Sequence, residues 1–126
     1  MPEAFLIDEL QHRCMGNPQL VQRVLASFRL SFMNDLAQME IHFLNGQLEK
    51  VAKTAHKIKG SAANAAAPAI SELAYEVENL ARQGNNDLDQ QICNLQSEFT
   101  RFATAAFREE VRQSNDDSST GKPTCA

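Results

Sequence analysis

The sequence of 126 residues is poor in turn-forming and aromatic residues. It contains no Trp, one Tyr, five Gly and four Pro. A fold with many strands needs turn-forming residues about every 8–12 positions, so this composition argues against a β-sandwich or a β-barrel. No apolar run approaches the roughly 18 residues that a membrane-spanning helix requires. The sequence therefore predicts neither a β-protein nor a membrane-spanning segment.

Cysteine and positive charge are also scarce. The three cysteines, Cys14, Cys93 and Cys125, are odd in number, far apart and form no Cys-x-x-Cys pair. A disulfide framework or a structural zinc site is therefore not expected, and we predict a reduced, cytoplasmic protein. The net charge of −4 disfavours a nucleic-acid-binding protein, because such a protein neutralises phosphates with a basic face.

Helical periodicity, by contrast, covers most of the chain. Apolar residues recur every three or four positions, and Gly or Pro residues separate the repeats. We predict a short helix over 2–13 and four long helices over 18–45, 47–64, 68–83 and 87–113. Long amphipathic helices with short connections favour an all-α fold. The expected architecture is an antiparallel up-down-up-down four-helix bundle, with the short N-terminal helix covering one end.

The end of the sequence lacks this periodicity. After Gln113 it reads SNDDSSTGKPTCA, which is polar and has no apolar repeat. Such a composition buries too little apolar surface to offset the entropy lost on ordering the chain. We therefore predict one helical domain over 1–112 and a disordered C-terminal tail over 113–126.

One run in the third predicted helix departs from an ordinary amphipathic pattern. Residues 55–64 read A-H-K-I-K-G-S-A-A-N, with His56 one turn before Gly60. A glycine inside a helix costs about 1 kcal/mol relative to alanine. Gly60 would clear the surface beside the imidazole, so that the backbone of another protein can approach it. Four lysines form a concentrated positive patch around this run: Lys50, Lys53, Lys57 and Lys59.

Helical geometry gives His56 and Glu78 comparable positions on their helices. At about 100° per residue, each lies about 100° from the centre of the apolar stripe of its own helix. Adjacent antiparallel helices bring two such side chains either both to the shared seam or both away from it. If both side chains lie on the shared seam, His56 and Glu78 can contact each other; if both lie away from it, they cannot.

These residue types suit phosphoryl transfer through histidine. A neutral imidazole is nucleophilic near neutral pH, and Nε2 can attack phosphorus while Nδ1–H donates to a carboxylate such as that of Glu78. A lysine one turn away can balance phosphoryl charge, and Ser61 can donate a hydrogen bond. The sequence has no phosphate-binding glycine loop and no acidic Mg²⁺ cluster. A partner must therefore supply the phosphoryl group and the metal.

The same run resembles a known family. H-K-I-K-G-S-A-A-N, followed by E-L-A-Y-E-V-E, is similar to the H-x-L-K-G-S-S-A-N pattern of histidine-containing phosphotransfer (HPt) domains in bacterial multistep phosphorelays. The resemblance covers about residues 5–110 and is most specific over 55–78. It implies that His56 is the phosphoacceptor, that Lys59 stabilises phosphoryl charge and that Gly60 provides access. It also implies that Ser61 is a nearby hydroxyl and that Glu78 holds the imidazole.

Two positions depart from the family pattern. Ala65 stands where the family has its apolar residue after Asn, and Ala66 stands where the bend usually has glycine. These departures are expected to tighten or shift the bend without touching the chemistry.

The resemblance implies a histidine phosphotransfer protein, which accepts a phosphoryl group on His56 from one receiver-domain aspartate and passes it to another. Expected partners are response-regulator receiver domains and a hybrid sensor kinase, with no nucleic acid and no membrane. No cofactor or metal is expected in the chain, since Mg²⁺ would be held by the receiver. The chain is expected to be a monomer without kinase, ATPase or hydrolase activity of its own.

The alternative function is a non-catalytic helical adaptor that binds a signalling partner through one face of the bundle. The two functions differ in a simple observable, because an adaptor would carry no acid-labile, base-stable phosphate on His56.

Overall fold

Residues 3–118 are described by a computed structural model, with side chains as far as residue 114. They form five helices and no strand, which confirms the predicted all-α class. The helices are α1 (Ile7–Arg13), α2 (Pro18–Leu44), α3 (Leu48–Asn64), α4 (Pro68–Arg82) and α5 (Asp89–Ser118). In this part of the chain, no helix has the length and apolar character needed to cross a bilayer.

The boundaries of α2 follow from the local sequence. The Asn17 side-chain oxygen accepts hydrogen bonds from the backbone N–H groups of Gln19 and Leu20 at 3.0 and 3.2 Å, and Pro18 occupies the first turn. At the other end, Gly46 adopts a φ of +70°, a conformation that ends a helix and favours glycine. The predicted start and stop of this helix are therefore confirmed.

The start of α5 differs from the prediction, which places it at residue 87. The helix begins at Asp89 instead. The Asn85 side chain accepts a hydrogen bond from the N–H of Asp87 at 2.8 Å. This bond holds Asp87 in a turn before the helix, because Asn side chains hydrogen-bond readily to the backbone two residues further on.

The end of α5 also differs from the prediction. The helix continues to Ser118, so residues 113–118 are helical although the sequence predicts a disordered tail from 113. The boundary predicted at residue 112 falls inside the helix, because no proline or glycine interrupts these residues. The rest of the predicted tail, 119–126, lies outside the described residues.

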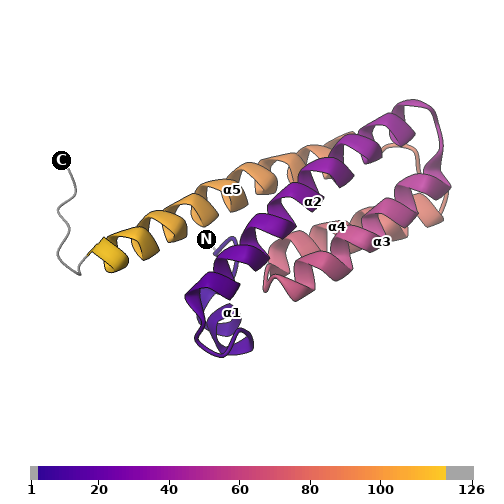
Figure 1. The fold of residues 1–126 in the computed structure, drawn as a ribbon. Coiled ribbons are helices and arrows are strands. Elements are labelled where there is room, and N and C mark those ends of the chain that lie inside the picture. The colour runs from indigo at the N-terminus through magenta and orange to yellow at the C-terminus, as the bar shows by residue number, and fades with distance from the viewer. Residues whose placement is uncertain (1–2, 119–126) are drawn as a thin grey trace.

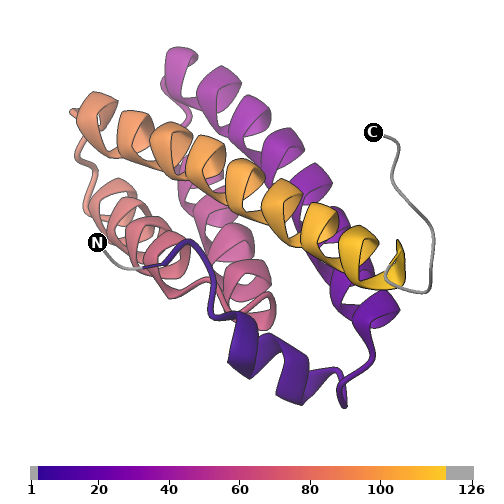
Figure 2. The ribbon, with the colours of Figure 1, turned by 90° about the vertical axis from the view of Figure 1, so that its left-hand side faces the viewer.

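The four long helices lie side by side around one apolar core (Figure 1, Figure 2). Helix α2 contacts α3 and α5, α4 contacts the same two helices, and α1 contacts α2. Each long helix therefore has two long neighbours, and no other long helix of the described residues packs on its outer surface.

Aromatic rings hold α2 against α5 and the N-terminal segment. The centre of the Phe102 ring lies 5.3 Å from that of Phe5 and 5.0 Å from that of Phe28. The Phe32 ring lies 5.3 Å from Phe28 and 5.4 Å from Phe99. Aromatic pairs in such tilted, stacked and edge-on arrangements add about 0.5–1.5 kcal/mol each beyond their buried area.

Small side chains line the contact between α3 and α4. Both helices bury alanines on their inner faces: Ala52, Ala55, Ala62, Ala74 and Ala81. The distance between packed helices depends on the side chains at the contact, so small residues allow a close approach. Longer side chains at the edge of this seam can then reach from one helix to the other.

The N-terminal segment is tied to the bend between α3 and α4. Arg13 Nη1 donates to the carbonyl oxygens of Ala63 and Asn64 at 2.7 and 3.3 Å. The Leu6 N–H donates to the Ala66 carbonyl oxygen at 2.7 Å. These bonds satisfy carbonyl groups at the end of α3 and in the bend, which have no partner within the helix.

Two residues other than glycine adopt a left-handed backbone conformation. Met15 and Ala66 each have a φ of 55°. Ala66 occupies the position where the family pattern usually has glycine, so the bend keeps a glycine-like conformation with an alanine. Such a conformation costs about 1–2 kcal/mol for a residue with a Cβ atom. The two residues differ in burial, because Met15 is 90% exposed and Ala66 is 3% exposed.

Met15→Gly should raise the free energy of unfolding by about 0.5–1 kcal/mol, because it relieves the left-handed strain and removes a side chain that packs on nothing. Ala66→Gly is the matched comparison. It relieves the same strain but removes a buried methyl group worth about 0.8 kcal/mol, so it should gain less. Urea unfolding followed by circular dichroism measures both changes. A Met15→Gly variant no more stable than the wild type would contradict this account of the turn.

Candidate functional site

His56 lies in the middle of α3 with most of its side chain in solvent. The side chain is 62% exposed, whereas Ala55 and Ile58 are buried in the core. The imidazole therefore stands at the edge of the buried face, where the helical geometry predicts it. A ring at this position is held by a packed helix and is still open to a partner.

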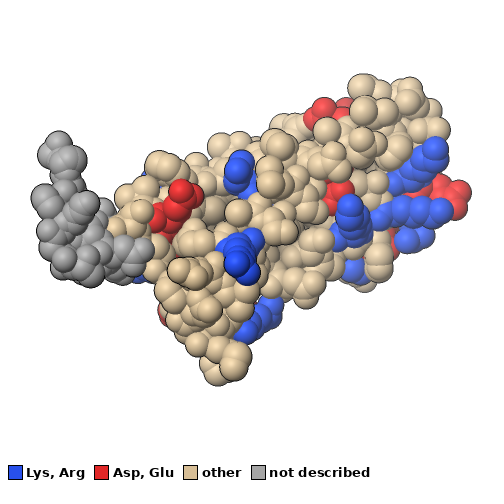
Figure 3. Space-filling view, viewed as in Figure 1, with Lys and Arg blue, Asp and Glu red and all other residues tan. Residues whose placement is uncertain are grey.

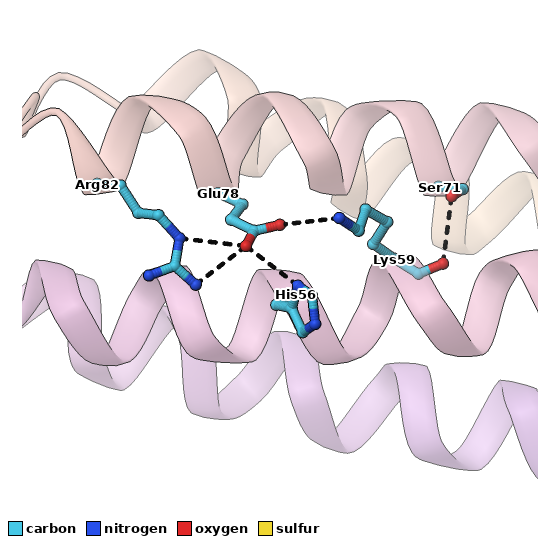
Figure 4. A network of polar contacts seen from close by, with 5 residues as sticks. All are labelled: His56, Lys59, Ser71, Glu78 and Arg82. Carbon is cyan, nitrogen blue, oxygen red and sulfur yellow. Dashed lines mark hydrogen bonds and ion pairs between the residues drawn. The ribbon is translucent and has the colours of Figure 1, made fainter.

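The imidazole contacts a carboxylate on the neighbouring helix. His56 Nδ1 lies 3.1 Å from Glu78 Oε2, so both side chains are on the shared seam between α3 and α4 (Figure 4). Glu78 is only 7% exposed, so it is not an ordinary solvated acid. Because Nδ1 faces Glu78, Nε2 is the ring nitrogen that is directed away from the carboxylate.

Two further side chains converge on the Glu78 carboxylate (Figure 4). Arg82 donates from Nε and Nη2 to Oε2 at 3.1 and 3.0 Å, and Oε2 is also the atom that faces His56. Lys59 Nζ lies 3.3 Å from Oε1. A guanidinium, an ammonium and an imidazole therefore surround one buried carboxylate, which is the kind of compensation that a buried charge requires.

These neighbours determine the ionisation of Glu78. Burial raises the pKa of its carboxyl group, because loss of water disfavours the charged form. The hydrogen bonds from Arg82, the ammonium group of Lys59 and the electrostatic interaction with His56 together outweigh burial and lower this pKa below its ordinary value. Glu78 is therefore ionised at neutral pH and can only accept hydrogen bonds. When the imidazole is neutral, a carboxylate that can only accept requires the proton on Nδ1, which leaves the lone pair on Nε2.

Lys59 is held by three side chains of α4. Besides its ion pair with Glu78, its Nζ lies 5.0 Å from the centre of the Tyr75 ring, over the ring face. Its backbone carbonyl oxygen accepts a hydrogen bond from the Ser71 hydroxyl at 3.2 Å. The family resemblance places Lys59 beside a phosphoryl group, whereas in this structure it lies on the carboxylate that contacts His56.

Gly60 and Ser61 lie outside this network. A Cβ atom added at Gly60 would meet nothing within 4 Å, so the fold itself does not require glycine there. Ser61 is half-buried, and its hydroxyl makes no hydrogen bond with any residue that the structure describes. The structure therefore does not join Ser61 to the group around His56.

The sequence analysis missed Arg82. Arg82 follows Glu78 by four residues on α4, a spacing that predicts an ion pair along a helix. Such pairs are common on solvated helix surfaces and contribute little there. The spacing is therefore a signal for the contact but does not identify a site without the burial of Glu78.

A second buried carboxylate, that of Asp35 on α2, was also not expected. Asp35 is 4% exposed, and it accepts a hydrogen bond from Lys57 Nζ at 3.1 Å. Lys57 directly follows His56, so this bond ties the same turn of α3 to α2, whereas Glu78 ties it to α4. The sequence signal for Asp35 is weak, because its helical position falls within the apolar stripe of α2.

Glu78→Gln should lower the free energy of unfolding by about 1–2 kcal/mol at neutral pH, because Arg82 and Lys59 lose an ionised partner. This loss should shrink as the pH falls. A carboxyl group whose pKa is lowered in the folded state stabilises the fold above its unfolded pKa, and the contribution disappears as the pH falls through the folded pKa. Urea unfolding of both proteins between about pH 7 and about pH 3 measures the difference.

The matched control for this experiment is Glu76→Gln. Glu76 is exposed and lies on the same helix, two residues before Glu78. Its replacement should change stability by less than about 0.5 kcal/mol at either pH. If the difference between wild type and Glu78→Gln stays constant or grows as the pH falls, the described ionisation of Glu78 is wrong.

Comparison with known protein families identifies the chain. Residues 23–116 match the family model of the Hpt domain. The matched segment contains all of α3 and α4, and with them His56, Lys59, Glu78 and Arg82. No curated protein and no solved structure matches the chain. Because the family match extends over well more than half of the sequence, the chain belongs to the Hpt domain family, whose members take part in phosphotransfer in two-component phosphorelays.

Proposed function

We propose that His56 carries the phosphoryl group as a phosphohistidine intermediate between two receiver-domain aspartates. The observation that carries this proposal is the contact of His56 Nδ1 with an ionised Glu78, because it leaves Nε2 of an exposed ring as the nucleophile. The other histidines lack such a partner. His42 Nδ1 faces the neutral side chain of Gln47 at 3.3 Å, and His12 lies exposed on α1.

In the proposed first step, Nε2 attacks the phosphorus of an aspartyl phosphate on a receiver domain. The N–P bond forms as the P–O bond breaks, and the aspartate carboxylate leaves with the bonding electrons. Nδ1 keeps its proton, and the ring takes a positive charge as its lone pair forms the new bond. In the second step, a carboxylate of another receiver attacks the same phosphorus, and the imidazole leaves as a neutral ring.

Glu78 is proposed to act on both the orientation and the charge of the ring. Its hydrogen bond with Nδ1–H holds one tautomer and one ring orientation, and its negative charge stabilises the imidazolium that develops during attack. Arg82 and Lys59 offset the charge of this carboxylate. The site therefore does not repel the negatively charged phosphoryl group, although an acidic residue lies next to the nucleophile.

The remaining parts of the reaction are proposed to lie on the partner. The chain has no glycine-rich phosphate loop of the kind that binds nucleotides. Receiver domains are the proposed donors and acceptors, in the cytoplasm, with a hybrid sensor kinase as the source of the phosphoryl group. Mg²⁺ is proposed to be held by the receiver, so that His56 needs no metal or cofactor of its own.

The long helices are proposed to form the antiparallel up-down-up-down bundle predicted from the sequence. The contacts of α2 and α4 with both α3 and α5 support this arrangement, as do the short connections between successive helices. His56, Lys59, Glu78 and Arg82 all come from α3 and α4 of one chain. A single chain is therefore proposed to be sufficient for transfer.

His56→Ala should abolish uptake of the phosphoryl group and leave the fold intact, because an exposed ring contributes little packing. Transfer of radioactive phosphate from a phosphorylated receiver domain measures the uptake, and acid-labile, base-stable label identifies phosphohistidine. Circular dichroism checks the fold. His12→Ala is the matched control and should accept phosphate at the wild-type rate, since His12 is exposed and has no carboxylate partner.

Two results would count against this function. Uptake by His56→Ala at the wild-type rate would exclude His56 as the phosphoacceptor. If the wild-type chain binds receiver domains of its own genome but takes no phosphate from any of them, the alternative of a non-catalytic adaptor would replace the proposal.

Gly60→Ala should stabilise the fold by about 1 kcal/mol, because glycine is unfavourable inside a helix and a Cβ atom meets nothing there. Gly60→Gln should give a similar stability but slow transfer by at least about tenfold, because its longer side chain occupies the space that a receiver backbone needs. Comparison of the two variants separates helix stability from access. Equal transfer rates in wild type, Gly60→Ala and Gly60→Gln would show that glycine is incidental at this position.

A further inference from the structure

The outer face of α2 carries a second apolar stripe that none of the described helices covers. Small or apolar residues recur there every three or four positions, and all are exposed: Ala26, Leu30, Met33, Ala37, Ile41 and Leu44. At about 100° per residue, the six lie within about 80° of one another. They lie opposite to the buried face of the same helix, which Leu25 and Phe32 represent. An apolar stripe of this length on a helix surface indicates a contact with another helix.

The stripe is separate from the surface around His56. Helix α3 packs on one side of α2, where Lys57 reaches Asp35. Helix α5 packs on the other side, where Glu40 accepts a hydrogen bond from Gln96. The stripe lies between these contacts, on the outside of α2, and most of the surface along α2 carries no charged side chain (Figure 3). A receiver domain that docks on the α3–α4 seam therefore leaves this stripe uncovered.

We propose that the stripe is the contact between two copies of this chain, which pair their α2 helices antiparallel about a two-fold axis near residue 35. With that register, small residues of one helix face large residues of the other. Ala26 lies opposite Leu44 of the partner subunit, and Ala37 lies opposite Met33 of the partner subunit. Leu30 lies opposite Ile41 of the partner subunit. The two-fold axis repeats each pairing, so one self-complementary surface satisfies both copies.

The charges beside the stripe fit the same register. Arg29 and Glu40 lie on the same flank of the stripe, since Arg29 lines a hollow between α2 and α5 and Glu40 contacts Gln96 of α5. They are 11 residues apart along α2, or about 17 Å at 1.5 Å per residue, so they cannot pair within one chain. In the antiparallel pair, Arg29 of each copy lies opposite Glu40 of the partner subunit. Arg29 makes no hydrogen bond or ion pair with any residue that the structure describes.

The surface beside Ala26 provides a place for the most exposed large residue of the stripe. Leu44 is 81% exposed. Ala26, Ala103 and Phe107 line a hollow between α2 and α5. Because the register places Leu44 of the partner subunit opposite Ala26, its side chain would enter this hollow. The 62% exposed ring of Phe107 would then be covered as well.

This proposal goes beyond the phosphotransfer function and changes one expectation from the sequence, which predicts a monomer. It does not rest on the role of His56. The stripe and the α3–α4 seam lie on different surfaces, so both copies of a dimer keep their imidazoles open to receivers. Measurements of mass test the dimer without any transfer reaction.

Sedimentation velocity of the full chain from about 5 to about 500 µM tests the association directly, because a reversible dimer follows mass action. The weight-average mass should rise with concentration from the 14.0 kDa of one chain towards twice that value. Met33→Glu, in the centre of the stripe, should raise the dissociation constant by at least about tenfold, because it places a charge in an apolar contact. Met15→Glu makes the same substitution at an exposed methionine outside α2 and should leave the dissociation constant unchanged.

Charge reversal tests the register. Arg29→Glu and Glu40→Arg should each weaken the dimer, because each places like charges opposite one another across the interface. The double variant should recover the wild-type dissociation constant, since it restores two opposite-charge pairs in reversed order. Unfolding midpoints of the variants confirm that all remain folded.

Each of the other outcomes overturns the proposal. A mass that stays at that of one chain over the whole concentration range excludes the second copy as the occupant, and the stripe would then be free to bind the apolar face of a helix from another protein. Equal effects of Met33→Glu and Met15→Glu would place the contact elsewhere. A double charge reversal that dimerises no better than either single variant would exclude the antiparallel register.

Discussion

The buried negative charge of Glu78 must be balanced by positive or hydrogen-bonding groups. The positions of the other site residues depend on this requirement. An ionised carboxylate removed from water costs several kcal/mol unless charged or hydrogen-bonding groups surround it. Arg82, Lys59 and His56 supply these groups from two helices. If one of them is lost, the others still share the same acceptor. If Glu78 is lost, the imidazole has no fixed acceptor and two positive charges have no counterion, so the ring orientation depends on Glu78 above all.

The same arrangement accounts for the presence of an acid beside the proposed nucleophile. A lone carboxylate near Nε2 would repel an incoming phosphoryl group, whereas Glu78 is offset by one lysine and one arginine. Glu78 uses only part of their hydrogen-bonding capacity, because an ammonium has three donors and a guanidinium has five. The Lys59 and Arg82 side chains are 31% and 52% exposed, so solvent or a partner can reach their remaining donors. The proposed function therefore assigns the orientation of the ring and the offset of negative charge to one set of residues.

The sequence alone predicted those features of the structure that depend on a local pattern of residues. Helical periodicity, with Gly or Pro residues at the breaks, predicted the class of fold and the limits of α2. Helical geometry put His56 and Glu78 at matched positions. It left open whether these positions face the seam, because that depends on which sides of α3 and α4 meet. It also missed Arg82 and Asp35, since only the burial of their contacts distinguishes them from ordinary surface charges. Ser61 makes no hydrogen bond with a described residue, and its role beside a phosphoryl group stays a prediction.

Two residues, Ala66 and Gly60, are not the residue types that their backbone conformations favour. The reasons differ between the two. Ala66 adopts a left-handed conformation that favours glycine, and it is almost fully buried at the bend. There its methyl group packs in the core and its carbonyl oxygen accepts the N–H of Leu6, so packing within the chain accounts for the alanine. Gly60 is the reverse case, a glycine in ordinary helix where a Cβ atom would meet nothing. No contact within the described chain accounts for it, and places where a sequence departs from local rules without internal benefit are expected at functional sites. We therefore propose that the reason for Gly60 lies outside the chain, in a partner that approaches His56 one turn away.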